Sequence, residues 1–160
     1  MYVSSTYVRA AGLRSWEQPV TTTVSSSSSA VRQGGCLCGA VRFEVPDAPD
    51  APHLCSCRHC QKLSGGPVMS WVCFPLAGLV WIGREPVWFY TYPQETRRGR
   101  CPDCGSQLCA LDDGATSIAF TFSALDDSLD LVPAFQSYAH DAVPWLRPVT
   151  DTRPAAAAGS

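Results

Sequence analysis

Short segments of alternating or wholly apolar residues, separated by turn residues, occupy the middle of the chain. Residues 40–45 alternate apolar and polar side chains, as a strand with one buried face does. Segments rich in β-branched and aromatic residues, also expected to be strands, lie at 68–74, 86–92, 116–122 and 132–138. Gly, Pro and Asp fill the gaps, and no segment has the period of a long amphipathic helix. The pattern predicts a small, mainly β fold in which most strands are antiparallel.

The two ends of the chain differ from this middle in composition. Residues 1–30 are rich in Ser and Thr without a sustained period, so we expect a disordered or loosely ordered tail. Residues 151–160 are rich in Ala and are expected to form a flexible tail. A single domain over 31–150 is left, which agrees with the usual domain size of roughly 100–150 residues.

Charge and hydropathy exclude several classes of protein. The 160 residues include 12 Lys and Arg against 14 Asp and Glu, so no broad basic surface favours nucleic acid. No apolar run approaches the roughly 18–20 residues of a membrane span, and the start lacks the pattern of a secretory signal. We therefore expect a cytoplasmic protein that binds neither nucleic acid nor membranes. The sequence leaves the oligomeric state open.

Nine cysteines are the unusual feature of the composition. An odd number without an export signal argues against a disulfide framework and favours metal ligands, catalytic thiols or core residues. Most of them fall into three clusters with short spacings. The clusters are Cys36 with Cys38, then Cys55 with Cys57 and Cys60, then Cys101 with Cys104.

The spacings predict how these clusters share metal ions. The first pair, on a strand, would point both sulfurs to one face. The third cluster is typical of a zinc knuckle, in which Pro102 fixes the turn and Gly105 takes the left-handed conformation. The two pairs together would close one structural zinc site with four thiolates. The triplet of Cys55, Cys57 and Cys60 would hold a second zinc with an open position, which can polarise a carbonyl or activate a thiol.

Other interpretations of the cysteines stay open at this point. One four-cysteine site could accompany a redox-active or metal-free triplet, and iron–sulfur ligation is possible although the spacings differ from ferredoxin runs. His53 or His59 could supply a fourth ligand to the triplet or lie around it. Cys73 and Cys109 lie in apolar segments, where we expect buried core thiols.

Two charged residues beside the triplet are candidates for substrate contacts. Arg58 and Lys62 could offset the thiolate charge and bind the carboxylates of a glutathione-like substrate, or they could be solvated loop charges. The basic run of Arg97, Arg98 and Arg100 could help to bind an anionic substrate, but a solvated hairpin face is expected.

Two tryptophans and a histidine could lie either at a pocket or elsewhere in the fold. Trp71 and Trp145 could line a pocket, but because Trp buries a large apolar area we expect both in the core. His140 follows a strand-like segment and is expected at the surface, or at most in the lining of a pocket.

The ordered motifs resemble those of a known family. Residues 34–43 read Gly-Gly-Cys-x-Cys-Gly-Ala-Val-Arg-Phe, and a Cys-x-Cys-x-x-Cys and a Cys-Pro-x-Cys-Gly motif follow. This series resembles the glutathione-dependent formaldehyde-activating enzyme family, which also includes centromere protein V. Residues 123–127 and 143–146 resemble the family's Ser-Leu-Asp-Asp turn and Ala-Pro-Trp segment. The resemblance covers residues 31–150.

The resemblance implies a small antiparallel β-tent fold with two zinc ions. The structural zinc is matched by Cys36, Cys38, Cys101 and Cys104, and the catalytic zinc by Cys55, Cys57 and Cys60. The family reaction is the reversible addition of glutathione to formaldehyde, which gives S-hydroxymethylglutathione. The chain is thus expected to be a zinc-dependent carbon–sulfur lyase that uses a small thiol and a small aldehyde. The rival functions are a non-enzymatic zinc-stabilised binding module like centromere protein V, and a thiol redox protein that uses the triplet.

Overall fold

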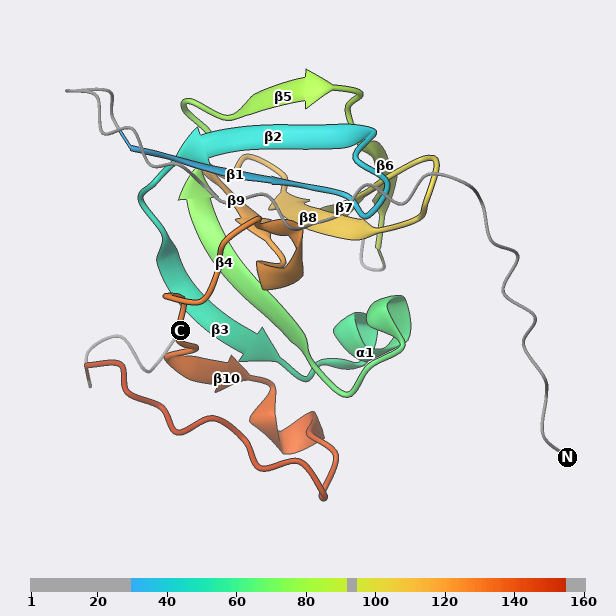
Figure 1. Ribbon diagram of the computed structural model, residues 1–160. Helices are drawn as coiled ribbons and strands as arrows, with labels where there is room; N and C mark the ends of the chain where they lie inside the picture. The colour runs from blue at the N-terminus through green and yellow to red at the C-terminus, as the bar shows by residue number, and fades with distance from the viewer. Residues whose placement is uncertain (1–29, 92–94, 155–160) are drawn as a thin grey trace, which may run out of the picture.

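The computed structural model describes residues 30–91 and 95–154, and these form two β-sheets (Figure 1). The predicted tail of residues 1–30 and the end of the Ala-rich segment lie almost entirely outside the described residues. The smaller sheet has the order β1-β2-β5, formed by Val31–Gly35, Val41–Pro46 and Val80–Gly83, and its pairs are antiparallel.

The larger sheet has seven strands in the order β10-β3-β4-β9-β8-β7-β6. The strands β3, β4, β6 and β7 span Asp50–Cys55, Met69–Pro75, Val87–Tyr90 and Thr96–Arg100, and β8, β9 and β10 span Gln107–Asp112, Ser117–Phe120 and Phe135–Ser137. Only the pair of β10 with β3 is parallel among the strands of the described part. The prediction of a mainly β, mainly antiparallel fold is confirmed.

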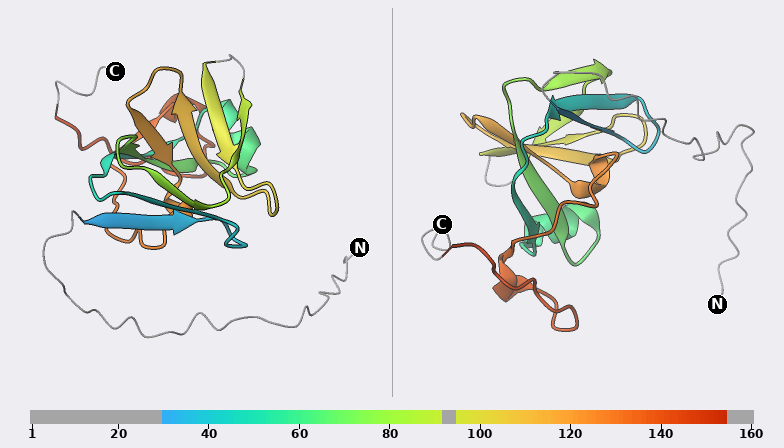
Figure 2. Two further views of the ribbon diagram at one scale, coloured as in Figure 1. Left: turned by 90° about the horizontal axis from the view of Figure 1, so that it is seen from above. Right: turned by 60° about the vertical axis from the view of Figure 1, so that its left-hand side comes forward.

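Helical structure in the described residues is short. The α-helix α1 spans Arg58–Ser64, and two 3-10 helices, η1 and η2, span Phe122–Ala124 and Ala139–Asp141. Helix α1 and strand β10 lie at one end of β3 and β4, away from the smaller sheet (Figures 1 and 2). None of the helices in the described ranges is long and apolar enough to cross a membrane.

The core lies between the smaller sheet and the strands β4, β8 and β9. Alternation places Val41, Phe43 and Val45 of β2 on its buried face, all at 0% exposure. The ring of Phe43 stacks on that of Phe120 from β9, with 3.9 Å between ring centroids. Long-range apolar contact of this kind stabilises short strands whose own propensity is modest.

Two arginines of the smaller sheet fasten the turn that follows η1. Arg42 of β2 forms a two-point ion pair with Asp126, and Arg32 of β1 donates to Asp130 at 2.8 Å and to Asp47 at 2.9 Å. Paired guanidinium and carboxylate groups of this geometry are directional. The Ser-Ala-Leu-Asp-Asp segment at 123–127 is thereby held against the strand that leads to the first cysteine pair.

Candidate metal centres and the adjoining cavity

Four cysteines from two distant turns meet in one group. The sulfurs of Cys36, Cys38, Cys101 and Cys104 all lie within 4.8 Å of one another. Cys36 Sγ is 3.5 Å from Cys38 Sγ, which is 3.7 Å from Cys101 Sγ. Tetrahedral zinc with bonds of about 2.3 Å needs sulfurs about 3.8 Å apart, so the four side chains fit such an ion.

Two similar glycine-terminated turns build this group. After β1, the Gly39 N–H donates to Cys36 O at 3.1 Å, and after β7 the Gly105 N–H donates to Cys101 O at 3.0 Å. The φ angles of Gly39 and Gly105 are +79° and +74°, the left-handed region that favours glycine. The expected conformation of Gly105 is confirmed. The expectation that Cys36 and Cys38 lie on a strand is wrong, because the chain turns directly after Gly35.

Ser106 links the two turns at the sulfurs. Its Oγ accepts a hydrogen bond from the N–H of Leu37 at 3.1 Å and lies 3.1 Å from Cys104 Sγ. The contact with Ser106 lowers the pKa of the exposed Cys104 thiol to about 6. A thiol that ionises readily is a better metal ligand, because metals bind the thiolate.

The triplet forms where a strand passes into a helix. Cys55 ends β3, Cys57 caps α1, and Cys60 lies in the first helical turn. The three sulfurs lie within 4.8 Å of one another, and Cys57 Sγ accepts from the Cys60 N–H at 3.4 Å. Among the described residues, neither His53 nor His59 joins this group. Three sulfurs fit a metal ion that keeps one coordination position open.

The triplet thiols share protons unequally. The contact between Cys55 and Cys60 lowers the pKa of Cys60 to about 5 and raises that of Cys55. Smaller contributions to the shift of Cys60 come from Cys57, Trp71 and the positive charge of Arg98, against the effect of burial. One thiolate is therefore favoured in this group near neutral pH even without a metal.

Polar side chains beneath the triplet hold its loop in place. Ser56, fully buried, has its hydroxyl bonded to Gln136 of β10 and donates its N–H to Ser137 O at 3.0 Å. The Nε2 of the buried Gln61 donates to Ser56 O at 2.7 Å and to Asp141 O at 3.1 Å. Loop, helix and C-terminal segment thus form one hydrogen-bonded unit around the three sulfurs.

A cavity of about 490 Å³ adjoins the triplet. This volume lies in the range of about 300–1,000 Å³ that is common for small-molecule sites. Besides the three sulfurs, its lining includes His53, His59, Trp71, Cys73, Arg98 and Tyr138.

The sequence predicts positions for two lining residues, Arg98 and Trp71, and one of them lies elsewhere. Arg98 is only 9% exposed and stacks on the ring of the buried Trp71, with 4.8 Å from Cζ to the centroid. The expectation that it lies on a solvated hairpin face is therefore wrong. Trp71 satisfies both alternatives considered for it, since it is a core residue at 3% exposure and also lines the cavity. The alternation of β7 separates Arg98 from Arg97, but only the tertiary fold determines which of them faces the cavity.

The charged residues proposed for substrate contact lie around the triplet but outside this lining. Arg58 donates to Gln61 Oε1 at 2.6 Å, and Lys62 is exposed in the last turn of α1. Their role toward a substrate stays a prediction.

Three other expectations can be compared with the structure. Cys109 is fully buried as predicted, whereas Cys73 is half-buried at the cavity. His140 is exposed as predicted, with 76% of its side chain accessible. The expectation of a core position for Trp145 is wrong, because 74% of it is exposed on a segment without regular structure.

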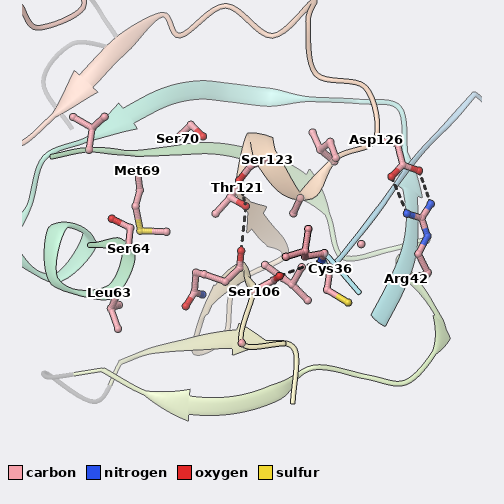
Figure 3. Close-up of a pocket in the computed structure, with 18 residues that line it drawn as sticks. Cys36, Arg42, Leu63, Ser64, Met69, Ser70, Ser106, Thr121, Ser123 and Asp126 are labelled. Carbon is pink, nitrogen blue, oxygen red and sulfur yellow. Dashed lines mark hydrogen bonds and ion pairs between the residues drawn. The ribbon is translucent and has the colours of Figure 1, made fainter. Parts of the chain in front are cut away.

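A second cavity, of about 600 Å³, lies beside the four-cysteine group (Figure 3). Its lining includes Cys36 but none of the triplet cysteines, and its charged residues, Arg42 and Asp126, pair with each other. Among its hydroxyls, Ser64 donates to Cys60 O at 2.8 Å and Ser70 accepts from the Phe122 N–H at 3.2 Å. The charged and hydroxyl groups named here therefore already have partners within the protein, whereas the cavity at the triplet contains three sulfurs that could hold a metal ion.

Fold and site together define a small β protein with two cysteine groups that could each hold a metal ion. The family model described as "Glutathione-dependent formaldehyde-activating enzyme" matches residues 31–141. The chain belongs to this family of glutathione-dependent formaldehyde-activating enzymes. It matches no curated protein.

A solved structure resembles the chain in part. It is the crystal structure of a Rhodobacter sphaeroides protein from structural genomics, 17% identical, with a TM-score of 0.49. The alignment covers 60% of this chain and 89% of that one. A likeness of this size adds nothing to the assignment of function.

Proposed function

We propose that the protein is a carbon–sulfur lyase that forms and cleaves the adduct of a small thiol and a small aldehyde at the triplet. In the forward direction a bond forms between the thiol sulfur and the carbonyl carbon, and the thiol proton passes to the carbonyl oxygen. The product is a hemithioacetal such as S-hydroxymethylglutathione. No oxidant or reductant is needed, because atoms and electrons balance in this addition.

The observation that carries the proposal is the convergence of three sulfurs on a cavity of substrate size. Cys55, Cys57 and Cys60 would hold zinc, and the family match supports an ion of this kind. When bound, zinc supplies positive charge that favours the deprotonated form of a thiol beside it. A fourth protein ligand would block this chemistry, and neither neighbouring histidine lies in the sulfur group.

The residues around the cavity would position the substrates. Trp71 forms an apolar wall beside Cys60, and Tyr138 and His59 reach the cavity from the C-terminal segment and from α1. Thiols and formaldehyde react without a catalyst, so holding both in contact accounts for much of the expected rate gain.

We further propose that the four-cysteine group holds a structural zinc. Its two turns lie 65 residues apart from Cys36 to Cys101, and closing such a loop is favoured by a bound ion. The two roles predict two zinc ions per chain, which elemental analysis of the purified protein can count. One zinc with three freely titrating thiols would instead favour the redox function.

The test of activity is exchange between free aldehyde and hemithioacetal, followed by NMR on zinc-loaded protein with a panel of thiols and aldehydes. Wild-type protein should accelerate exchange for at least one pair, and Cys57→Ser should not. Exchange no faster than in buffer for every pair would refute the lyase and favour the binding module.

A further inference from the structure

Arg98 is a buried cation at the triplet cavity without an acidic partner. It lies on β7, where strand alternation places the side chains of Arg98 and Thr96 on the cavity side. Arg97 lies on the opposite side of the strand, where it contacts the ring of Trp88. Nine-tenths of Arg98 is buried, and no carboxylate of the described residues lies within the 4.0 Å of an ion pair. Its Nε is buried and has no hydrogen-bond partner.

The acidic residues that line the same cavity, Glu95 and Asp112, form no ion pair with Arg98. Glu95 and Asp112 are both exposed, and Asp112 accepts a hydrogen bond from Thr96 Oγ1 at 2.5 Å. The same cavity lining contains the three triplet sulfurs, which carry negative charge as thiolates. A metal-bound triplet of thiolates carries only one net negative charge, and a guanidinium has several donors that can bind in parallel.

A buried, unpaired guanidinium is costly unless an anion satisfies it in the working state of the protein. The contact of Arg98 Cζ with the Trp71 ring, at 4.8 Å from the centroid, restricts the guanidinium, and its planar fork matches a planar, two-oxygen anion. A carboxylate has this shape. Because the same cavity contains the three sulfurs, a substrate bound there can reach the guanidinium with a carboxylate close to its reacting atoms.

We propose that Arg98 is a specificity-determining residue that binds a carboxylate of the substrate beside the cysteine triplet. The inference rests on the proposed function and deepens it: the site takes carboxylate-bearing substrates, with the carboxylate on either the thiol or the aldehyde. Arg58 and Lys62 are then not required for this contact, since they lie outside the cavity lining.

The test compares charged substrates with neutral ones of similar shape. Zinc-loaded full chain is assayed for exchange with 3-mercaptopropionate and with 3-mercaptopropionamide, each with formaldehyde. A second arm uses the neutral thiol 2-mercaptoethanol with glyoxylate and with formaldehyde. The first arm detects a carboxylate bound on the thiol, and the second detects one bound on the aldehyde.

Arg98→Met should raise KM for the carboxylate-bearing substrate of one arm by about tenfold, because a charge-assisted two-point contact is lost. The neutral substrates should change by less than about twofold. Arg97→Met is the matched control, since Arg97 has the same unpartnered Nε and a similar contact with a Trp ring, but lies on the opposite face of β7. It should leave KM for both classes within about twofold.

A readout independent of turnover uses 3-(methylthio)propanoate, which has the carboxylate but no thiol. Its dissociation constant, measured by ligand-observed NMR, should rise by about tenfold in Arg98→Met and stay unchanged in Arg97→Met. If Arg98→Met fails to fold, Arg98→Lys is used instead, because it keeps the charge and the aliphatic stem of the side chain. It should raise KM by about threefold, for the carboxylate substrate alone, because the fork geometry is lost.

An equal effect of Arg98→Met on charged and neutral substrates would overturn the proposal, since Arg98 would then act on the thiolates or on the fold. A failure of the lyase function itself looks different: wild-type protein would accelerate no exchange at all. In that case thioether binding that depends on Arg98 would still support the carboxylate site, and binding that does not would overturn it.

Discussion

Gln136 donates a hydrogen bond to the hydroxyl of Ser56 at 2.6 Å, across 80 residues of chain. Ser56 lies between two triplet cysteines and is fully buried, so this bond fixes the triplet loop to the C-terminal segment. The other end of the amide is also used, because Gln136 Oε1 accepts from the Val149 N–H at 3.0 Å. The geometry of the three sulfurs therefore depends on residues far beyond the cysteine motif.

Gln136→Leu should reduce the free energy of unfolding by about 1–3 kcal/mol, because it leaves the buried Ser56 hydroxyl and the Val149 N–H without their partner. Denaturant unfolding measures this loss, and competition with a chelator should show weaker metal retention at the triplet. Gln33→Leu is the control, since its amide bond to Glu44 lies at the surface and its loss should cost no more than about 0.5 kcal/mol. Equal losses in both variants would contradict the role given to Gln136.

The sequence predicts the β architecture and the three cysteine clusters, because strand alternation and ligand spacing are local properties. That the two cysteine pairs meet across 65 residues is predicted from the four ligands of a closed zinc site and from the family resemblance. Strand β3 could not be predicted, since residues 50–55 contain Pro and His and become a strand only by pairing with β4. The burial of Arg98 is of the same kind. A run of three arginines is typical of a solvated face, and only the placement of β7 beside the triplet cavity shows that one of them faces inward.

Cys101→Ser should unfold or aggregate the domain if the four-cysteine group holds a structural zinc, because the ion supplies free energy of folding. Thermal melting and size-exclusion chromatography of the variant give the measurement. The control is Cys73→Ser, which alters a half-buried thiol outside both sulfur groups. An unchanged melting temperature for Cys101→Ser would argue against a structural ion at this position.

Cys57→Ser should remove one metal ion and the exchange activity while the fold remains. Cys57 is half-buried at the start of α1, and the hydroxyl of Ser can still accept the Cys60 N–H as a helix cap. Elemental analysis should give one zinc in place of two, and the melting temperature should fall less than it does in Cys101→Ser. Loss of both ions would show that the two groups are not independent.

Gly105→Ala should destabilise the four-cysteine group through the backbone alone. A Cβ at this position meets nothing within 4 Å, but φ is +74°, a conformation that costs a residue with a side chain about 1–2 kcal/mol. Gly105→Asn should lose less, because Asn tolerates the left-handed region better than Ala. Chelator competition and thermal melting of both variants test this order. If Ala and Asn were equally harmful, the left-handed backbone conformation would not explain why glycine follows the second cysteine of the turn.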